Sequence, residues 1–106
     1  MRSIGDKLED YLESRLKGVK KTTNSGAFWD NADLSSKDCI FEAKVKNKGG
    51  VSISPKILEK VKKQAARASR ESIVIQQVPC GTYVVLELEF FIELWEMYAN
   101  RKILKV

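Results

Sequence analysis

The sequence predicts an α/β fold in which three helices alternate with two pairs of strands. Three segments repeat apolar residues at the helical period, and four shorter runs alternate apolar and polar residues or are rich in β-branched residues. A Ser-Pro pair marks the start of a helix, and a Pro-Cys-Gly triplet marks a hairpin turn. The predicted order is α-β-β-α-β-β-α, within one domain over residues 1–106.

Composition narrows the class of protein. The chain is 43% hydrophobic and 31% charged, which is typical of a globular protein rather than a disordered one. It has no apolar run of membrane-spanning length and no apolar signal core at its start, so we expect an intracellular, cytoplasmic protein, or one in the host cytoplasm if a virus encodes it. Two cysteines are too few for a disulfide framework, and the absence of histidine removes histidine-based catalysis. The net charge of +5 favours an anionic partner.

The first helix is predicted over residues 6–17, ending at Gly18. Its apolar stripe consists of Leu8, Tyr11, Leu12 and Leu16. Glu9 lies at the edge of this stripe, about 100° around the helix from Leu8, where it could reach over a neighbouring sheet. The alternative, an exposed helix acid, fits the pattern equally well.

A polar, basic loop follows at residues 20–26. Lys20, Lys21 and Ser25 could hold a phosphate there, together with backbone N–H groups. The same residues also suit an ordinary connection between helix and strand.

An antiparallel strand pair is predicted at residues 27–34 and 38–45, with a turn between them. Alternation puts Glu42 and Lys44 on one face of the second strand, and Asp33 can lie beside them on the first. Two carboxylates form a hard-oxygen site for Mg²⁺, and an adjacent lysine can orient a water that attacks a phosphodiester. Alternating charges also describe a half-exposed strand, which is the simpler alternative.

Basic residues dominate the segment after this pair. Residues 46–50 form a basic, glycine-containing loop with Lys46 and Lys48. Ser54 and Pro55 then open a second helix as N-cap and first helical residue. Its apolar stripe leaves most of the remaining surface basic, which predicts contacts to DNA phosphates by Lys56, Lys60, Lys63 and Arg67. Gln64 flanks the stripe and could point toward the carboxylates. The alternative interpretation of the basic residues is an ordinary solubilising surface helix.

The remainder is predicted to be a hairpin and a closing helix. The strands cover residues 72–78 and 82–88, and the helix covers residues 89–101. Its apolar face is wide for a small protein, so we expect core on one side and a partner interface on the other.

Asp33 followed by Glu42-Ala43-Lys44 resembles the metal-and-lysine motif of the PD-(D/E)xK nuclease superfamily. The order and size of the elements resemble most closely the Holliday-junction resolvases of archaeal, RecU-like and phage types. Glu9, Ser25-Gly26 and Gln64 match the early glutamate, the serine–glycine loop and the helix glutamine of those enzymes. Ala32 departs from the proline of the superfamily name. The resemblance implies a restriction-endonuclease-like core with a mixed sheet of about four strands.

The same resemblance implies a function and a site. The activity would be a Mg²⁺-dependent endodeoxyribonuclease that resolves four-way DNA junctions, with Mn²⁺ as a substitute. Asp33, Glu42 and the Ala43 backbone carbonyl would hold the ion, Glu9 would act on a second ion or through water, and Lys44 would position the water. Two symmetric cuts imply a homodimer. The alternatives are another DNA endonuclease on this core (nicking, restriction-like or repair) and a non-catalytic DNA-binding module.

Overall fold

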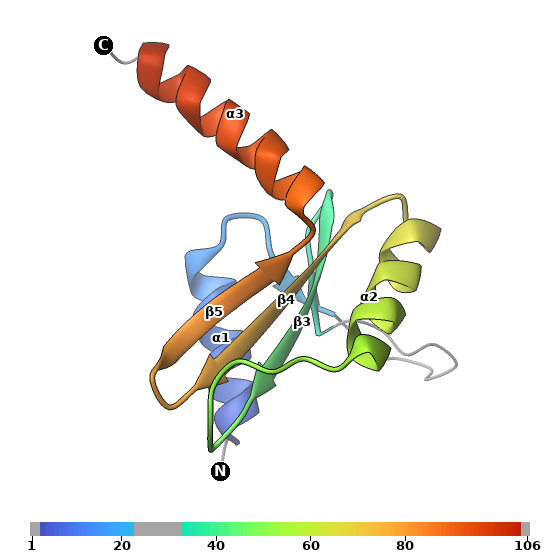
Figure 1. Cartoon of the computed structure of the whole chain (residues 1–106), viewed down its shortest axis with the longest axis vertical. Helices are drawn as coiled ribbons and strands as arrows, with labels where there is room; N and C mark the ends of the chain where they lie inside the picture. Colours follow the sequence, from blue (N-terminus) through green and yellow to red (C-terminus); the bar gives the residue numbers. More distant parts are fainter. Residues whose placement is uncertain (1–2, 23–32, 105–106) are drawn as a thin grey trace.

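The computed structural model describes residues 3–22 and 33–104. In that part of the chain, a five-stranded sheet lies between two helices, and a third helix follows it (Figure 1). The elements in chain order are α1 (Ile4–Arg15), β1 (Lys20–Lys21), β2 (Leu34–Ser35), β3 (Cys39–Val45), α2 (Pro55–Arg67), β4 (Glu71–Val78), β5 (Gly81–Leu86) and α3 (Leu88–Leu104).

The sheet is mixed, and its strands follow the order β1-β2-β3-β4-β5. The β3 and β4 strands are parallel, and the other three neighbouring pairs are antiparallel. The prediction of a mixed sheet flanked by helices is confirmed. The expected start of the first loop is wrong, because Lys20 and Lys21 form β1 and add a strand to the predicted order.

A short hairpin joins β2 to β3, as the sequence predicts. Leu34 pairs with Phe41 and Ser35 with Ile40. The turn is closed by Ser36, whose backbone N–H donates to the Cys39 carbonyl at 2.8 Å and whose Oγ accepts from the Cys39 N–H at 3.1 Å. The predicted strand residues 27–32 lie outside the described part of the chain.

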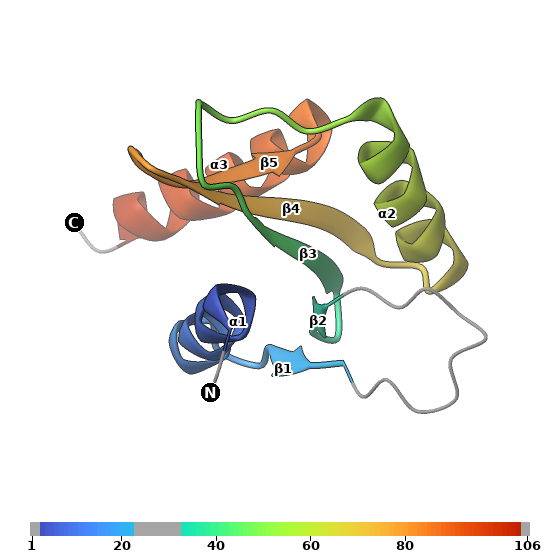
Figure 2. The same cartoon turned by 90° about the horizontal axis from the view of Figure 1, so that it is seen from below.

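One face of the sheet is covered by α1 (Figure 2). This helix begins with a capping box, in which the Ser3 hydroxyl and the Asp6 carboxylate each accept a hydrogen bond from the other residue's backbone N–H. Leu8 and Leu12 pack against the sheet in a core with Leu34, Phe41 and Ile73, among others. Tyr11 and Leu16 are exposed, so the buried stripe is narrower than predicted.

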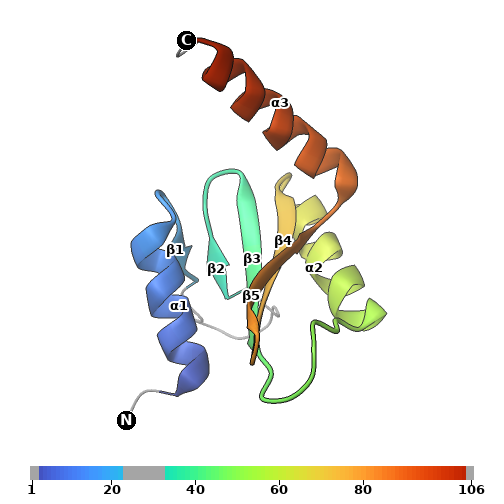
Figure 3. The same cartoon turned by 60° about the vertical axis from the view of Figure 1, so that its left-hand side comes forward.

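The opposite face is covered by α2, as Figure 3 shows. Ser54 caps the helix and Pro55 follows as predicted. Val61 and Ala65 pack on Ile40 of β3 and Val74 of β4, which fixes the helix over the parallel strand pair. The face that carries Ile40 also carries Glu42 and Lys44, by the alternation of β3.

The third helix, α3, extends away from the rest of the molecule (Figures 1 and 3). Leu88 begins this helix rather than ending β5. Phe90 packs against the first core, whereas Phe91, Trp95 and Tyr98 are exposed. The expectation that one side of this helix is core is therefore met only near its first turn. No helix in the described ranges has the length and apolar character that a membrane span requires.

Candidate nuclease site

Asp33, the residue before β2, lies beside Glu42 of β3. The β2–β3 register pairs Leu34 with Phe41, and one further step of this antiparallel register sets Asp33 opposite Glu42. The Asp33 Oδ2 atom accepts a hydrogen bond from the Ala43 backbone N–H at 2.8 Å. This bond ties the aspartate side chain to β3 next to Glu42.

Glu42 is buried and carries one oxygen without a partner. Its residue exposure is only 2%, although it is acidic. Oε2 lies 3.0 Å from Nζ of Lys44, which partly offsets the cost of burying the carboxylate. Oε1 is buried and has no hydrogen-bond partner among the described residues. A buried carboxylate oxygen in this state is poised to bind a cation or a water.

Two more buried oxygens without described partners belong to residues that border this face. One is Gln64 Oε1 on α2, and the other is Thr22 Oγ1. The Thr22 N–H donates to the Asp33 carbonyl at 3.0 Å, so Thr22 stands beside Asp33 in the sheet. Lys21 forms an ion pair with Asp10 on the α1 side, and alternation therefore directs Thr22 to the other face, with Glu42.

Glu9 on α1 lies close enough to Asp33 for the Asp33 carboxylate to raise the pKa of Glu9. Burial raises the pKa of Glu9, and the Asp33 carboxylate is the next largest cause. Asp6 and Asp10 also raise this pKa, and Lys21 lowers it. Glu9, which the sequence places at the edge of the apolar stripe, is thus electrostatically coupled to Asp33.

The donor atoms suit a hard cation with few protein ligands. No group of three or more Asp, Glu, Cys or His side chains is close enough to form a metal cage within residues 3–22 and 33–104. Mg²⁺ needs no such cage, because it keeps several waters and is commonly held by one or two carboxylates together with substrate phosphate. Glu42 Oε1, which has no partner within the described ranges and lies beside Asp33, fits that type of site.

The predicted phosphate-binding residues of α2 form one line along the helix. Residues 56, 60, 63 and 67 recur at intervals of three or four, so Lys56, Lys60, Lys63 and Arg67 share a face about 60° wide. Gln64 lies between this basic face and the buried stripe. The basic face therefore borders the flank of α2 that carries the Gln64 oxygen.

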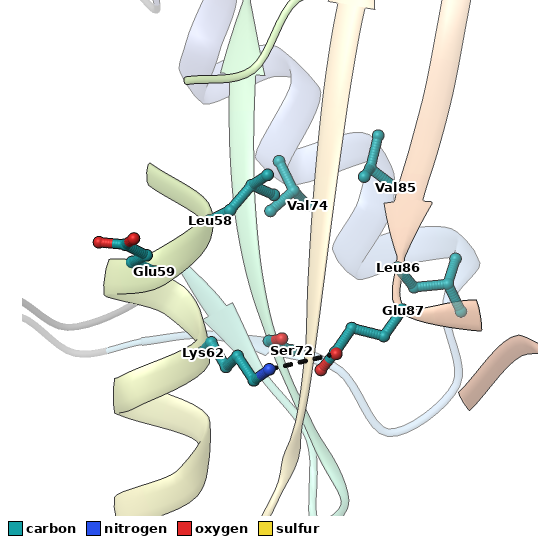
Figure 4. A pocket seen from close by; sticks show the side chains of 8 residues that line it. All are labelled: Leu58, Glu59, Lys62, Ser72, Val74, Val85, Leu86 and Glu87. Carbon is teal, nitrogen blue, oxygen red and sulfur yellow. Dashed lines mark hydrogen bonds and ion pairs between the residues drawn. The ribbon is translucent and has the colours of Figure 1, made fainter. Parts of the chain in front are cut away.

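Lys62 lies on the other flank of α2 and has a different role. Its Nζ is 3.2 Å from Glu87 Oε2, at the end of β5. This ion pair lies across a pocket whose apolar lining includes Leu58, Val74 and Val85 (Figure 4). The basic face defined by residues 56, 60, 63 and 67 thus lies on the solvent side of the helix and does not share the flank of Lys62.

The remaining predicted DNA contacts are placed less uniformly. Lys21 forms an ion pair with Asp10, and its backbone N–H donates to Glu13 Oε2 at 2.8 Å. Its side chain therefore lies on the α1 face of the sheet and not on the face of Glu42. Lys20 and Lys48 are exposed. Lys46 Nζ donates to the Gly50 carbonyl at 3.1 Å within its own loop. Ser25 lies outside the described residues.

The sequence interpretation missed Gln76, which anchors the loop between β3 and α2. Gln76 is paired with Lys44 in the parallel register and is buried. Its Oε1 accepts from the Ser52 N–H at 2.8 Å, and its Nε2 donates to the Ser52 carbonyl at 3.1 Å. The adjacent glutamines Gln76 and Gln77 in the otherwise apolar stretch 73–78 were the available signal, because buried amides in strands require partners.

Comparison with known proteins supports the fold. No protein-family model matches the chain, and no curated protein sequence matches it. Among solved structures, it is similar to Hjc, a Holliday junction resolvase from the archaeal hyperthermophile Archaeoglobus fulgidus. The match has a TM-score of 0.59 at 17% sequence identity and covers 76% of this chain and 73% of the other. The chain therefore has a resolvase-like α/β fold of the restriction-endonuclease type.

Proposed function

We propose that this protein is a metal-dependent endodeoxyribonuclease that cuts four-way DNA junctions. The observation that carries the proposal is the buried Glu42, with one oxygen bound to Lys44 and the other without a described partner, next to Asp33. A purely structural strand would not bury an acid in this way, because an unsatisfied carboxylate oxygen is costly. The similarity to the fold of a Holliday junction resolvase supports DNA junctions as the substrate class.

Asp33 and Glu42 would hold a Mg²⁺ or Mn²⁺ ion together with the Ala43 backbone carbonyl. When bound, the ion would acidify a coordinated water and neutralise charge on the phosphate. Lys44 would orient the attacking water and stabilise the negative charge that develops on the scissile phosphate. Glu9 would contribute through water or a second ion, and Gln64 would donate a hydrogen bond to DNA or to a bound water.

The basic face of α2 would hold the DNA backbone beside this site. Its four cations give an electrostatic, sequence-independent affinity, which is what recognition of a branched structure requires. Resolution of a junction needs two symmetric cuts, so we propose that the active form is a homodimer. We further propose that the protein acts inside the cell, where such DNA is found.

A labelled synthetic junction tests the proposal. The wild-type protein should cut a four-way junction with Mg²⁺ or Mn²⁺ and should bind it without cutting when Ca²⁺ replaces them, because Ca²⁺ positions water less strictly. Asp33→Asn should abolish cutting, whereas Asp38→Asn, in the exposed turn of the same hairpin, should retain it. Cutting in excess EDTA would disprove metal dependence. Equal cutting of linear duplex would indicate a different endonuclease, and binding without cutting under all conditions would indicate a DNA-binding module.

A further inference from the structure

The exposed surface of α3 is unusually apolar. Leu88 and Met97 are each 67% exposed, and Phe91, Trp95 and Tyr98 are 48%, 57% and 52% exposed. The three aromatic rings follow one line of the helix, with centroids 6.2 Å apart between Phe91 and Trp95 and 5.7 Å apart between Trp95 and Tyr98. Ile92 and Leu94 are exposed as well.

The area of this surface approaches that of a stable interface. An aromatic side chain offers about 150–250 Å². At the observed exposures the three rings leave about 300 Å² open, and the four exposed aliphatic side chains of the helix roughly double this figure. The sum of about 600 Å² is at the upper end of what monomers expose and close to the roughly 800 Å² that each partner buries in a standard interface.

The polar side of α3 excludes two classes of partner. Glu89, Glu93 and Glu96 lie together on one side of the helix, by the helical period. Acids in this position repel DNA phosphates. They also differ from the lysines and arginines that membrane-surface helices present on their polar face. A protein surface is the remaining kind of partner.

A second surface at the base of α3 is complementary to the helix itself. Val84, Leu86, Leu88 and Phe91 line a shallow apolar pocket where β5 meets α3. Val84 is exposed, because α1 packs mainly over β3 and leaves this end of the sheet uncovered. One molecule therefore carries both a projecting apolar helix and an apolar pocket that can accept such a helix. This combination is what a two-fold interface requires, since each subunit must supply both halves.

We infer that α3 and the pocket at its base form an interface between two copies of this chain. The two α3 helices run antiparallel, and the far part of each aromatic line, at Trp95 and Tyr98, covers Val84 and Phe91 of the other subunit. The 17 residues of α3 span about 25 Å, which is long enough to reach from one base to the other. This inference names the interface of the homodimer in the proposed function, but it depends only on the apolar surface described above.

Sedimentation of the full chain without DNA and in EDTA tests the interface separately from the nuclease activity. The wild-type protein should have twice the mass of one chain at micromolar concentration. Trp95→Glu and Tyr98→Glu should each raise the dimer dissociation constant by about 100-fold or more, as buried hot-spot residues do. Glu93→Gln, on the acidic side of the same helix, should leave the mass unchanged.

Val84→Glu tests the apolar pocket at the base of α3. Val84 is exposed within one chain, so a charge at this position should not unfold the protein. The variant should also be monomeric while its circular dichroism spectrum stays that of the wild type. A wild-type protein that remains monomeric at 100-fold higher concentration would overturn the inference, as would a Val84→Glu protein that still forms the same dimer. Loss of DNA cleavage with the dimer intact would instead count against the proposed function alone.

Discussion

Lys44 and Glu42 form an ion pair of 3.0 Å between two side chains on the same face of one strand. Glu42 is buried, and its second carboxylate oxygen has no described partner. The lysine is therefore the described counter-charge that balances this acid within the protein. The pair sets up several measurable consequences.

Lys44→Ala should destabilise the fold more than the double change Lys44→Ala with Glu42→Gln. The single variant leaves a buried carboxylate without its ammonium, whereas the amide of the double variant carries no charge to compensate. Thermal unfolding in EDTA measures the difference. Addition of Mg²⁺ should raise the melting temperature of the single variant and not that of the double variant. Equal melting temperatures in EDTA would show that Glu42 does not depend on Lys44.

Two substitutions of Asp33 should differ in their effect on stability but not in their effect on cleavage. The Asp33→Asn side chain retains an oxygen that accepts the Ala43 N–H, whereas Asp33→Ala leaves this backbone donor without its acceptor. We expect Asp33→Ala to lower the free energy of unfolding by about 1–3 kcal/mol and Asp33→Asn to lower it less. Both should reduce cutting by about 10²-fold or more, because both remove a ligand charge. Urea unfolding and junction cleavage, measured on the same preparations, check the two effects.

Asp33→Asn and Glu42→Gln should bind a junction as well as the wild type or better in the absence of metal, since two carboxylates beside a phosphate repel it. A gel-shift assay in EDTA tests this expectation. Weaker binding by both amide variants would show that the carboxylates do not face the DNA.

Charge reversal on α2 should distinguish its two flanks. The triple change Lys60→Glu, Lys63→Glu and Arg67→Glu should weaken DNA binding for every sequence alike. It should also reduce the slope of log affinity against log salt by about 0.9 per lost phosphate contact. Lys62→Glu combined with Glu87→Lys is the matched control, since it inverts an ion pair on the flank near β5. A similar loss in the control would show that the flank near β5 also contacts DNA, because the control leaves the net charge unchanged.

Glu9 should make stability depend on pH. Its pKa is raised in the folded protein, first by burial and then by Asp33, so its ionisation opposes folding. Glu9 does not lower the free energy of unfolding below its unfolded-state pKa, where it is protonated in both states. The loss of stability develops as the pH rises and is complete above its folded-state pKa. Glu9→Gln should therefore stabilise the protein at pH 7 in EDTA, with a gain that diminishes toward pH 4. Glu93→Gln on α3 is the control, and an equal gain from Glu9→Gln at pH 7 and at pH 4 would contradict the raised pKa of Glu9.

Much of this arrangement was accessible from sequence, because it depends on local patterns. The alternation around Glu42, the Ser36 turn and the Ser54-Pro55 helix start each involve a few adjacent residues. The β1 strand was missed because two lysines have low strand propensity, and the pairing of Lys21 with Asp10 and Glu13 of α1 stabilises them there. The exposure of Tyr11, Leu16 and most of α3 was also missed, since periodicity shows which residues share a face but not which neighbour covers it.

The two halves of the candidate site depend on contacts of very different range along the chain. Asp33 and Glu42 meet through a tight hairpin, whereas the basic face of α2 is positioned by the parallel pairing of β3 with β4, which joins Cys39 to Glu71. Closing the longer loop costs about 1 kcal/mol more in chain entropy. A partly folded chain can thus hold the two acids together before the cations of α2 are in place, and such a chain lacks the ordered basic face that would hold the DNA backbone. Binding to DNA therefore selects the completed sheet, and nucleic acid should act as a folding ligand that shifts the population toward it.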